Sequence, residues 1–466
     1  MKKYRKNIYL LLILFVLSIA TRFIFFGYPK EVVFDETYFG KFASSYLTGN
    51  YYFDLHPPLG KLLISGMGYT AGAKTDSTDY SKINNPYKDD IYIWYRLLPT
   101  IAGILLPLII FFIILQLGVS SLGAFVTSAL IIFENSLVVQ ARFISLDSIL
   151  LFFGFSALLL YLLYSKSNDE KKKVYLVLSA IFASLAFCIK WTGLSFLGLI
   201  LFMELYEIFR NRLSGILSKT KSLIKYAKIV TLFFIIGFAI YFSSFVIHFA
   251  LLPKTGLGDV FMSESFQKTL VGSKYENNQD IKVPNLPEKF FELNKEMYAV
   301  NARMDAEHSY SSLWYTWPFM YRPVFYWQGI IDDESLSRPY IYYLGNPIIY
   351  WLSIGAIILL VLLSRFFKDS RKTALFIIAG FCINFLPFIF IGRVMFLYHY
   401  ATALIFAVMA LVLIIDRISV RRTKYVLFGA LLILSVASFT FFSPLTYGRP
   451  LTDSQLAHRI WFPSWR

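Results

Sequence analysis

The chain has few charged residues and very few cysteines for its length. Only 16% of its 466 residues are Asp, Glu, Lys or Arg, whereas 57% are hydrophobic. Soluble domains carry about 25% charged residues, so this composition excludes an ordinary soluble protein. The two cysteines, Cys188 and Cys382, both fall in apolar runs, which argues against a disulfide framework or a thiolate metal site. The five histidines have no paired ligand spacing, so a structural zinc site is not expected.

Long apolar runs dominate the chain instead, and its mean hydropathy is +0.58. A helix needs about 20 apolar residues to cross a bilayer. Such runs lie near residues 8–26, 97–117, 120–139, 145–164, 174–189, 191–209, 229–250, 346–364, 373–391, 396–415 and 424–442. The sequence therefore predicts an all-α polytopic membrane protein with about 11 transmembrane helices. The stretch 174–209 is open to two interpretations, one long helix or two spans joined tightly at Lys190.

The net charge of +16 has a distribution that indicates membrane topology. Lys and Arg gather in alternate connections, at residues 2–6, 166–173, 210–228, 365–372 and 417–424. Basic connections remain in the cytoplasm, so we expect a cytoplasmic N-terminus, an extracytoplasmic C-terminal tail and a multi-pass protein of the cell membrane. The same distribution argues against a nucleic-acid partner and makes the lipid bilayer the expected surroundings. No small-residue cleavage site follows the first apolar run, which we interpret as an anchor.

The first long outer loop, residues 27–96, holds a cluster of acidic residues and a histidine: Asp35, Glu36, Asp54 and His56. Carboxylates at a membrane surface are costly to desolvate and often belong to a reaction or a transport path. Asp35 has a second interpretation, as the cap of a helix that begins near Glu36. Apolar spacing predicts that helix over 36–47. A second helix, opened by Pro57–Pro58, is predicted over 59–71 and is too short to span the membrane.

Several basic residues lie at the ends of predicted spans. Arg96 opens the second span, where it could extend toward lipid phosphates or bind a substrate phosphate with two hydrogen bonds. Arg142 with Asp147, and Lys190 by itself, allow either an intramembrane ion pair or a headgroup contact. Glu134, inside an apolar run, must face protein or water.

The largest outer loop, residues 252–345, is too long for a simple connector. Its second half is aromatic around Trp314 and follows His308. The aromatic side chains fit either a belt at the membrane interface or a platform for a sugar or a peptide. A later outer turn brings Arg393 and His399 to the same side of the membrane as the acidic cluster.

Together these segments resemble a known enzyme family. The resemblance depends on Asp35–Glu36, the string Phe53-Asp-Leu-His-Pro-Pro-Leu-Gly-Lys61, Arg96–Leu97, Ala141–Arg142 with Leu146-Asp-Ser148, Lys190-Trp-Thr-Gly193, Ser311–Pro318, Phe396–Tyr400 and the tail from Tyr447 to Trp465. In this order they are similar to the protein O-mannosyltransferases, membrane enzymes of the GT-C glycosyltransferase fold. The resemblance covers nearly the whole chain and implies a single GT-C domain over 1–466, with interfacial helices on the extracytoplasmic face.

The resemblance implies transfer of mannose, with inversion, from a polyprenyl-phosphate-mannose donor to Ser or Thr hydroxyls of secreted or membrane proteins. Asp35 matches the catalytic base, and Glu36 would support it or bind the acceptor. The donor phosphate would be held by Arg96, with Lys190, Arg142 and Arg393 as further candidates. The expected residues of the pocket and acceptor site are Asp54, His56, His308, Trp314 and His399. No cofactor is expected, and a requirement for a divalent cation is left open.

The chain departs from the family pattern at two places. The loop 252–345 is too short to contain the β-trefoil domain of eukaryotic members, so the chain resembles the shorter prokaryotic form, and Tyr38 stands where many members have histidine. Two alternatives to the mannosyltransferase stay open. One is a GT-C transferase with another lipid-linked sugar or a lipid or cell-wall acceptor. The other is a non-enzymatic lipid transporter, which is disfavoured because the charges concentrate at the outer edge instead of the bilayer midplane.

Overall fold

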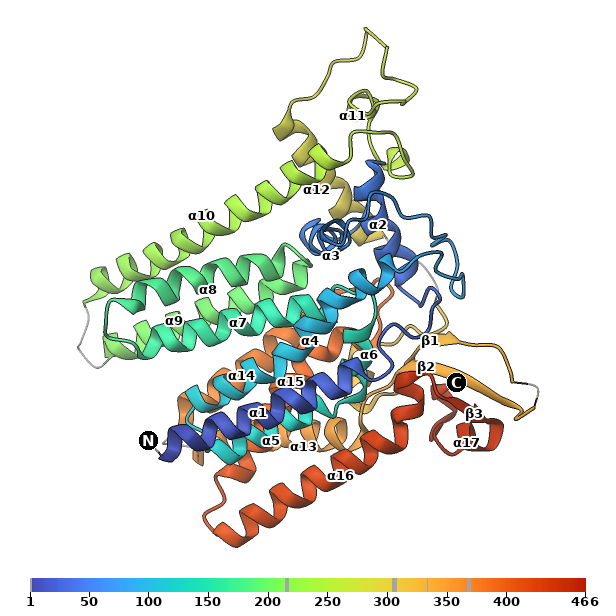
Figure 1. Cartoon of the computed structure of the whole chain (residues 1–466). Coiled ribbons are helices and arrows are strands. Elements are labelled where there is room, and N and C mark those ends of the chain that lie inside the picture. Colours follow the sequence, from blue (N-terminus) through green and yellow to red (C-terminus); the bar gives the residue numbers. More distant parts are fainter. Residues whose placement is uncertain (1, 214–217, 304–307, 333, 367–369) are drawn as a thin grey trace.

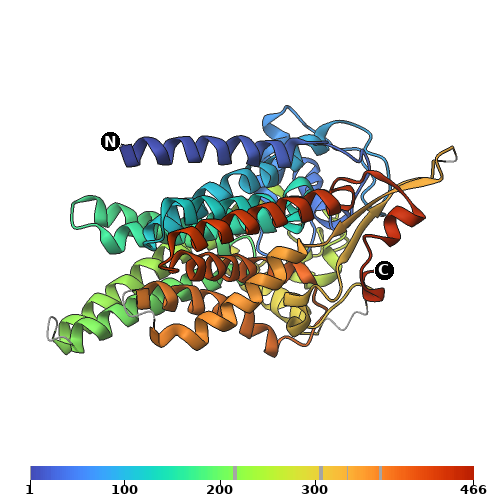
Figure 2. The same ribbon diagram turned by 90° about the horizontal axis from the view of Figure 1, so that it is seen from below.

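The structure is a computed structural model that describes residues 2–213, 218–303, 308–332, 334–366 and 370–466. Long helices run side by side along most of the molecule, and the loops, short helices and a small sheet gather at one end (Figure 1). The N-terminus lies at the opposite end of the helices from the C-terminus, as the second view also shows (Figure 2).

The predicted apolar runs all lie in helices. These long or paired helices are α1 (Lys2–Phe23), α4 (Ile91–Gln116), α5 (Ser121–Ile132), α6 (Asn135–Arg142), α7 (Asp147–Lys166), α8 (Lys171–Phe187), α9 (Leu194–Leu213), α10 (Lys219–Leu251), α13 (Pro347–Leu363), α14 (Arg371–Phe385), α15 (Ala401–Asp416) and α16 (Arg421–Tyr447). The short helices are α2 (Glu36–Thr48), α3 (Leu59–Thr70), α11 (Glu264–Gln267), α12 (Leu286–Arg303) and α17 (Asp453–Ala457). The 3₁₀ helices are η1 (Trp191–Gly193), η2 (Asp259–Phe261), η3 (Trp314–Phe319), η4 (Ser364–Phe366), η6 (Leu386–Phe390), η7 (Leu397–Tyr400) and η8 (Pro463–Trp465).

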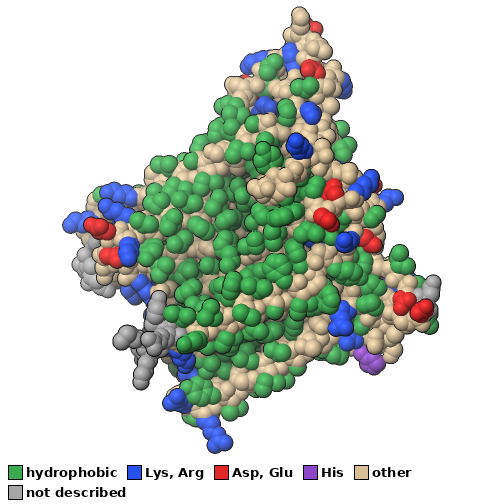
Figure 3. Space-filling model, viewed as in Figure 1, with side chains coloured by type: hydrophobic (Ala, Val, Ile, Leu, Met, Phe, Trp, Pro, Cys, Tyr) green, Lys and Arg blue, Asp and Glu red, His purple; other side chains and the backbone are tan. Residues whose placement is uncertain are grey.

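The protein is a multi-pass membrane protein. In the described part of the chain, 9 helices are long and apolar enough to cross a membrane, and up to 10 if one bent pair is a single span. Hydrophobic side chains cover the middle of the face in Figure 3, whereas charged side chains gather at its ends. This is the surface that a bilayer requires, because charged groups are costly in hydrocarbon. The remaining predicted span, 174–189, forms α8, which has 17 residues and is shorter than a typical span.

The run predicted as one span over 120–139 is broken. It forms α5 and α6, which are bent by 59° relative to each other. The cause is Glu134, which is fully buried and caps the N-terminus of α6 by accepting from the Leu137 N–H at 2.8 Å. Its other oxygen accepts from the Asn346 N–H at 2.7 Å. A buried carboxylate needs such donors, and these are supplied by a helix end.

The ambiguous stretch 174–209 consists of two helices. α8 ends at Phe187, Lys190 lies in the connecting turn, and η1 leads into α9. Gly193 allows this tight turn, since a Cβ at that position would be 2.5 Å from the Ala186 carbonyl carbon. The turn places Lys190 at the loop end of the molecule.

The two helices predicted in the first outer loop are present. α2 ends at Gly49, whose φ of 80° is in the left-handed region that glycine adopts easily. α3 follows Pro58, which is its N-cap residue, and has 12 residues. Both helices lie at the loop end of the molecule (Figure 1).

A three-stranded antiparallel sheet, which the sequence did not predict, completes this end. It consists of β1 (Val324–Gln328), β2 (Ser337–Tyr343) and β3 (Pro450–Thr452), in that order, with a bulge between Phe325 and Trp327. The C-terminal tail therefore pairs with the large outer loop. Trp465 fixes the tail, because its buried indole N–H donates to the Met320 carbonyl at 2.7 Å.

Candidate active site

A cavity of about 1130 Å³ lies where the loops within 27–96 and 252–345 meet the ends of the long helices. Its polar walls include Asp35, Lys41, Asp54, His56, Lys82, Asp147, Lys190, His308, Asn384, Arg393, Tyr398 and His399. Part of its apolar wall comes from α7, α9, η6 and α15, and includes Leu150, Leu151, Leu194, Pro387, Phe388 and Ala401. Further apolar residues, such as Phe39 and Ile83, come from α2 and from the loop after α3. The cavity therefore offers both polar and apolar walls, as a site for an amphipathic ligand does.

Asp35 lies at the N-cap position of α2 but does not act as its cap. Its side chain makes no capping hydrogen bond, and it lines the cavity instead. The preceding residue, Phe34, has a φ of 36°, a strained value for a residue with a side chain. Phe34 is held there by stacking on Tyr326 at 4.6 Å between ring centroids. Strain of this kind is common where a backbone must aim a functional group.

The pKa of Asp35 is raised to about 7, mainly because its surroundings exclude water from the carboxylate. The positive charge of Lys190 acts in the opposite direction, and the negative charges of Asp147 and Asp54 raise the pKa further. A carboxylate with a pKa near the working pH suits a general base.

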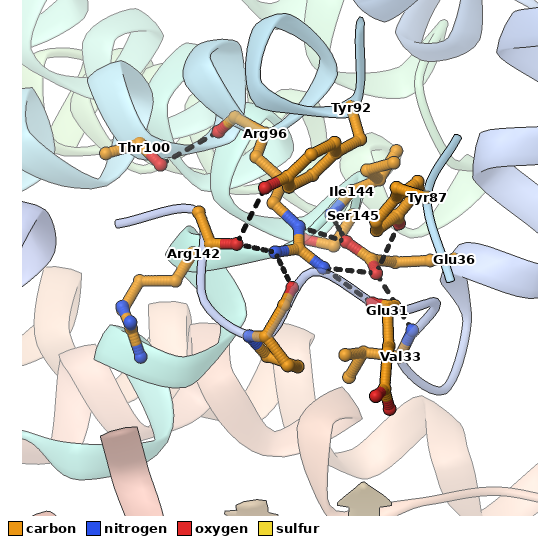
Figure 4. Close-up of polar contacts among 12 residues, drawn as sticks. Glu31, Val33, Glu36, Tyr87, Tyr92, Arg96, Thr100, Arg142, Ile144 and Ser145 are labelled. Carbon is orange, nitrogen blue, oxygen red and sulfur yellow. Dashed lines mark hydrogen bonds and ion pairs between the residues drawn. The ribbon is translucent and has the colours of Figure 1, made fainter. Parts of the chain in front are cut away.

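Glu36, the next residue, is 1% exposed, is not part of the cavity lining, and points toward Arg96 and Tyr87 (Figure 4). Its carboxylate accepts five hydrogen bonds of 2.8–2.9 Å: two from Arg96, one from the Tyr87 hydroxyl, and one each from the backbone N–H groups of Val33 and Ile144. These donors come from α4, from the loop before it, from the segment before α2, and from the turn between α6 and α7. Glu36 therefore joins the chain segments that surround Asp35.

Arg96 is fully buried on α4 and uses its whole guanidinium group within the protein (Figure 4). Besides its two bonds to Glu36, it donates to the carbonyls of Gly27, Pro29 and Glu31 at 2.8–3.1 Å. An arginine side chain has five N–H groups, and all five have partners here. Arg96 does not line the cavity.

Arg142 is also buried outside the cavity lining. It donates to the carbonyls of Thr446 at 3.1 Å and Phe25 at 2.7 Å, and it lies over the Tyr447 ring. Of the two interpretations left open for Arg142 and Asp147, the structure shows an ion pair for Asp147, but with Lys190 and not with Arg142. Lys190 donates to both Asp147 oxygens at 2.8 and 3.0 Å.

The Asp147–Lys190 pair belongs to a longer chain of hydrogen bonds. Gln140 on α6 donates to Asp147 at 2.6 Å and accepts from the Tyr326 hydroxyl at 2.6 Å. Tyr326 is on β1 and stacks on Phe34. The pair and the strained residue before Asp35 are thereby connected through the sheet.

Asp54 and His56 line the cavity from the loop between α2 and α3. Asp54 pairs with the buried Lys61 of α3, which also donates to the His56 carbonyl at 2.7 Å. The pKa of His56 is well below its usual value, first because the ring is buried and then because Lys190 and Lys61 are near it. His56 is therefore neutral at pH 7.

The remaining candidates come from the later outer segments. Arg393 lines the cavity between η6 and η7, and burial lowers its pKa. His399 lines it from η7 and stacks on Trp317 at 5.8 Å between centroids. His308 lines it near Phe34 and Phe396. Trp314 is outside the lining and packs against Phe385.

The structure thus gathers most of the predicted site residues around one cavity and leaves four outside its lining: Glu36, Arg96, Arg142 and Trp314. The roles predicted for these four residues in catalysis, phosphate binding or acceptor binding remain predictions. The sequence reasoning did not select Tyr398, Asn384, Lys41 or Lys82, which also line the cavity. Tyr398 is inside the Phe396–Tyr400 segment, and Lys41 is on α2, which begins directly after Asp35. Closeness in sequence to the recognised segments was therefore an available signal for these two residues.

Within the described residues, no group of three or more His, Cys, Asp or Glu side chains is arranged to hold a metal ion. The charged side chains of the lining are four cations, Lys41, Lys82, Lys190 and Arg393, and three carboxylates, Asp35, Asp54 and Asp147, two of which have a lysine partner. That arrangement suits an anionic ligand better than a bound cation.

Two family profiles match most of the chain. Residues 12–253 match the dolichyl-phosphate-mannose-protein mannosyltransferase family, and residues 286–465 match the C-terminal four-transmembrane region of protein O-mannosyltransferases. The chain is 35% identical over 272 residues to dolichyl-phosphate-mannose–protein mannosyltransferase 4 of Candida albicans, which covers 55% of this chain and 35% of that protein. It is 31% identical over 281 residues to protein O-mannosyl-transferase 2 of Danio rerio, covering 58% of this chain and 36% of that protein. The chain thus spans about a third of these curated relatives.

Solved structures show the same fold. The Saccharomyces cerevisiae protein O-mannosyltransferase Pmt1–Pmt2 complex bound to the sugar donor superimposes with a TM-score of 0.88 at 20% identity, covering 99% of this chain and 93% of that one. The archaeal oligosaccharyltransferase AglB of Archaeoglobus fulgidus gives a TM-score of 0.55 at 14% identity, covering 96% and 56%. The fold is therefore GT-C-like, and with the two family profiles the chain belongs to the dolichyl-phosphate-mannose-protein mannosyltransferase family.

Proposed function

We propose that the protein transfers mannose from a polyprenyl-phosphate-mannose to Ser or Thr hydroxyls of secreted or membrane proteins, with inversion at the sugar. The observation that carries the proposal is the position of Asp35. Its carboxylate is free of capping bonds, has a pKa raised to about 7, and lines a cavity that has both polar and apolar walls. The identity of the sugar and the class of acceptor are inferred from the family to which the chain belongs.

The donor lipid occupies the cavity from its apolar side. Leu194 on α9, Phe388 in η6 and Ala401 on α15 form walls that suit a prenyl chain. Arg393 and Lys190 lie on the polar walls and hold the phosphate. A phosphate leaving group needs cations more than it needs a protonating acid, because its oxygen leaves with the electron pair.

Asp35 acts as the general base. It takes the hydroxyl proton of Ser or Thr while the hydroxyl oxygen forms a bond to the anomeric carbon and the bond from that carbon to the phosphate oxygen breaks. One direct displacement inverts the anomeric configuration. Proton transfer to a positioned base contributes about 10²–10⁴-fold to such rates.

Glu36 and Arg96 act as positioning residues for this base. All the N–H groups of Arg96 are used within the protein, so we assign the donor phosphate to the cations that face the cavity. The bidentate Glu36–Arg96 pair fixes the start of α2 against α4, and Asp35 is the residue before that start. Bidentate pairs of this kind restrict geometry as well as adding energy.

Reconstitution tests the proposal. The purified wild-type protein in lipid vesicles is given polyprenyl-phosphate-mannose and a Ser/Thr-rich peptide, and the product is analysed by mass and by the susceptibility of its linkage to an anomer-specific mannosidase. We expect a peptide heavier by one hexose and a linkage of opposite configuration to the donor. A linkage of the same configuration would exclude the direct displacement, and donor consumption without peptide modification would exclude a protein acceptor.

A further inference from the structure

Two lysines at the polar side of the cavity have no part in the function proposed above. Lys41 is on α2, and Lys82 is in the loop between α3 and α4; both line the cavity. Lys82 is exposed and Lys41 is half-buried. Neither side chain has an ion-pair or hydrogen-bond partner among the described residues. We call Lys41 and Lys82 the lysine pair.

A close contact fixes the two elements that carry the lysine pair. The Tyr80 ring lies directly on Gly40 of α2, where a Cβ would be 2.1 Å from the ring. Tyr80 also donates its hydroxyl to Asp76 at 2.8 Å, within its own loop. Lys41 follows Gly40, and Lys82 is two residues beyond Tyr80. The lysine pair therefore flanks one packed contact and is held at one side of the cavity.

No carboxylate forms an ion pair with Lys41 or Lys82 in the part of the chain that the structure describes. Two carboxylates of the cavity lining already have cationic partners, Asp54 with Lys61 and Asp147 with Lys190. Carboxylates of the loop that carries Lys82 bond within that loop: Asp76 accepts from Tyr80 and from the Thr78 N–H, and Asp79 accepts from the Ser81 N–H. Arg393 is assigned to the donor phosphate. Within the described lining, only Asp35 is left as an unpaired carboxylate, so the lysine pair presents free positive charge.

Resting on the proposed function, we propose that the lysine pair selects acceptor segments that carry Asp or Glu close to the modified Ser or Thr. Lys41 follows Asp35 by six positions on the chain, which is about 9 Å of helix rise. An extended peptide covers about 3.3 Å per residue. An acidic side chain about three residues from the hydroxyl at Asp35 therefore reaches the lysine pair.

The position of the lysine pair favours a peptide over a lipid as the source of the negative charge. Lys82 belongs to a loop rich in Ser, Asp and Asn, residues 74–90, which also contributes Tyr80 and Ile83 to the lining. Most aliphatic residues of the lining come instead from α7, α9, α14, η6 and α15. The prenyl chain of the donor needs those apolar walls, which leaves the side with the lysine pair for the acceptor. If the lysine pair contacted the headgroup of the donor lipid instead, replacing the two lysines would weaken donor binding.

Three peptides with one Thr and identical lengths test the inference on the wild-type protein, with Glu, Gln or Lys three residues to either side of the Thr. We expect kcat/KM to be highest for the Glu peptide, about fivefold above the Gln peptide, since exposed ion pairs contribute modestly. The ratio should approach one in high salt, which screens exposed charges. Equal kcat/KM for the Glu and Gln peptides would overturn this inference but leave the proposed function standing. Modification of none of the three would overturn the proposed function and this inference with it.

Variants locate the effect. In the double variant Lys41→Gln/Lys82→Gln, we expect the ratio of kcat/KM for the Glu peptide to that for the Gln peptide to fall close to one. The double variant Lys41→Arg/Lys82→Arg keeps both charges and should keep the wild-type ratio. Lys74→Gln removes a charge from the same loop outside the cavity lining and should keep the wild-type ratio. An unchanged ratio in the double Gln variant would overturn the assignment to the lysine pair. The assignment would also be overturned if the double Gln variant lost kcat/KM equally for all three peptides and had a raised KM for the donor. That result would indicate that the lysines contact the lipid headgroup.

Discussion

Asp35 is a carboxylate whose behaviour is decided by its neighbours. Exclusion of water raises its pKa to about 7, and Lys190 limits that rise. Lys190 is itself held by Asp147, so part of its charge is already compensated. A base with this pKa is partly ionised at neutral pH and can still hold the proton it takes from a hydroxyl.

The rate should therefore depend on pH through Asp35. The carboxyl group is a base only when deprotonated, so kcat/KM should rise about tenfold per pH unit below pH 7 and level off above it. The measurement is kcat/KM for one neutral peptide between pH 5 and 8.5 at fixed ionic strength. A flat profile over that range would mean that no group with a raised pKa takes the proton.

Replacement of Glu36 tests its role as the partner of the buried Arg96. Glu36→Gln keeps the size of the side chain but leaves the buried Arg96 charge without its partner, so we expect a loss of about 3–5 kcal/mol in stability. Thermal unfolding in detergent measures this as a lower Tm, with activity lost in parallel. Lys282→Gln, which breaks the exposed Lys282–Glu288 pair, is the control and should leave Tm unchanged. A wild-type Tm for Glu36→Gln would contradict the positioning role.

The turn between α8 and α9 is a structural feature that the hydrophobic pattern of the sequence could not decide. The pattern allowed one helix or two, because both halves are apolar. The structure has two, and the reason is a contact between backbones at Gly193 that no hydrophobic period reveals. The same limit explains the break before Glu134, whose partner Asn346 is far away in sequence.

A glycine substitution tests the turn. In Gly193→Ala the new Cβ would meet the backbone of Ala186, which cannot move aside, so we expect a loss of about 1–3 kcal/mol and lower activity through displaced Lys190. Gly198→Ala in α9 meets only Ile383, at 3.8 Å, and should be neutral or stabilising by about 0.5–1 kcal/mol. Equal Tm values for the two variants would contradict this account of the turn.

In the whole molecule, the charges at the ends of the helices indicate an orientation. The basic connections 166–173 and 417–424, which join α7 to α8 and α15 to α16, lie at the end with the N-terminus, whereas α2, which lines the cavity, lies at the opposite end (Figure 1). The positive-inside rule then predicts that the cavity opens outside the cytoplasm.

Single cysteines test this orientation. Asn277→Cys lies in the large outer loop, and Asn168→Cys in the turn between α7 and α8; both positions are exposed. The native Cys188 is buried and Cys382 half-buried, so background labelling should be low. In intact cells an impermeant maleimide should label Asn277→Cys alone. Labelling of Asn168→Cys alone would reverse the orientation.

The helices and the segment around Asp35 were predictable from the sequence, because hydrophobic period and length are local properties. The sheet was not, since β3 joins β2 across more than 100 residues and contains only Pro450–Thr452. The partners of Glu36, Arg96 and Lys190 were not predictable either. Charged residues at span ends have several possible partners, and only the packing of the helices selects among them.

The most direct measurement of the central claim compares Asp35→Asn with the wild type in reconstituted vesicles, for both donor binding and mannose transfer. Asn has the shape of Asp but cannot take a proton. We predict donor affinity within a few-fold of the wild type and transfer reduced by about 10²–10⁴-fold. Transfer by Asp35→Asn at close to the wild-type rate would contradict the claim that Asp35 is the base.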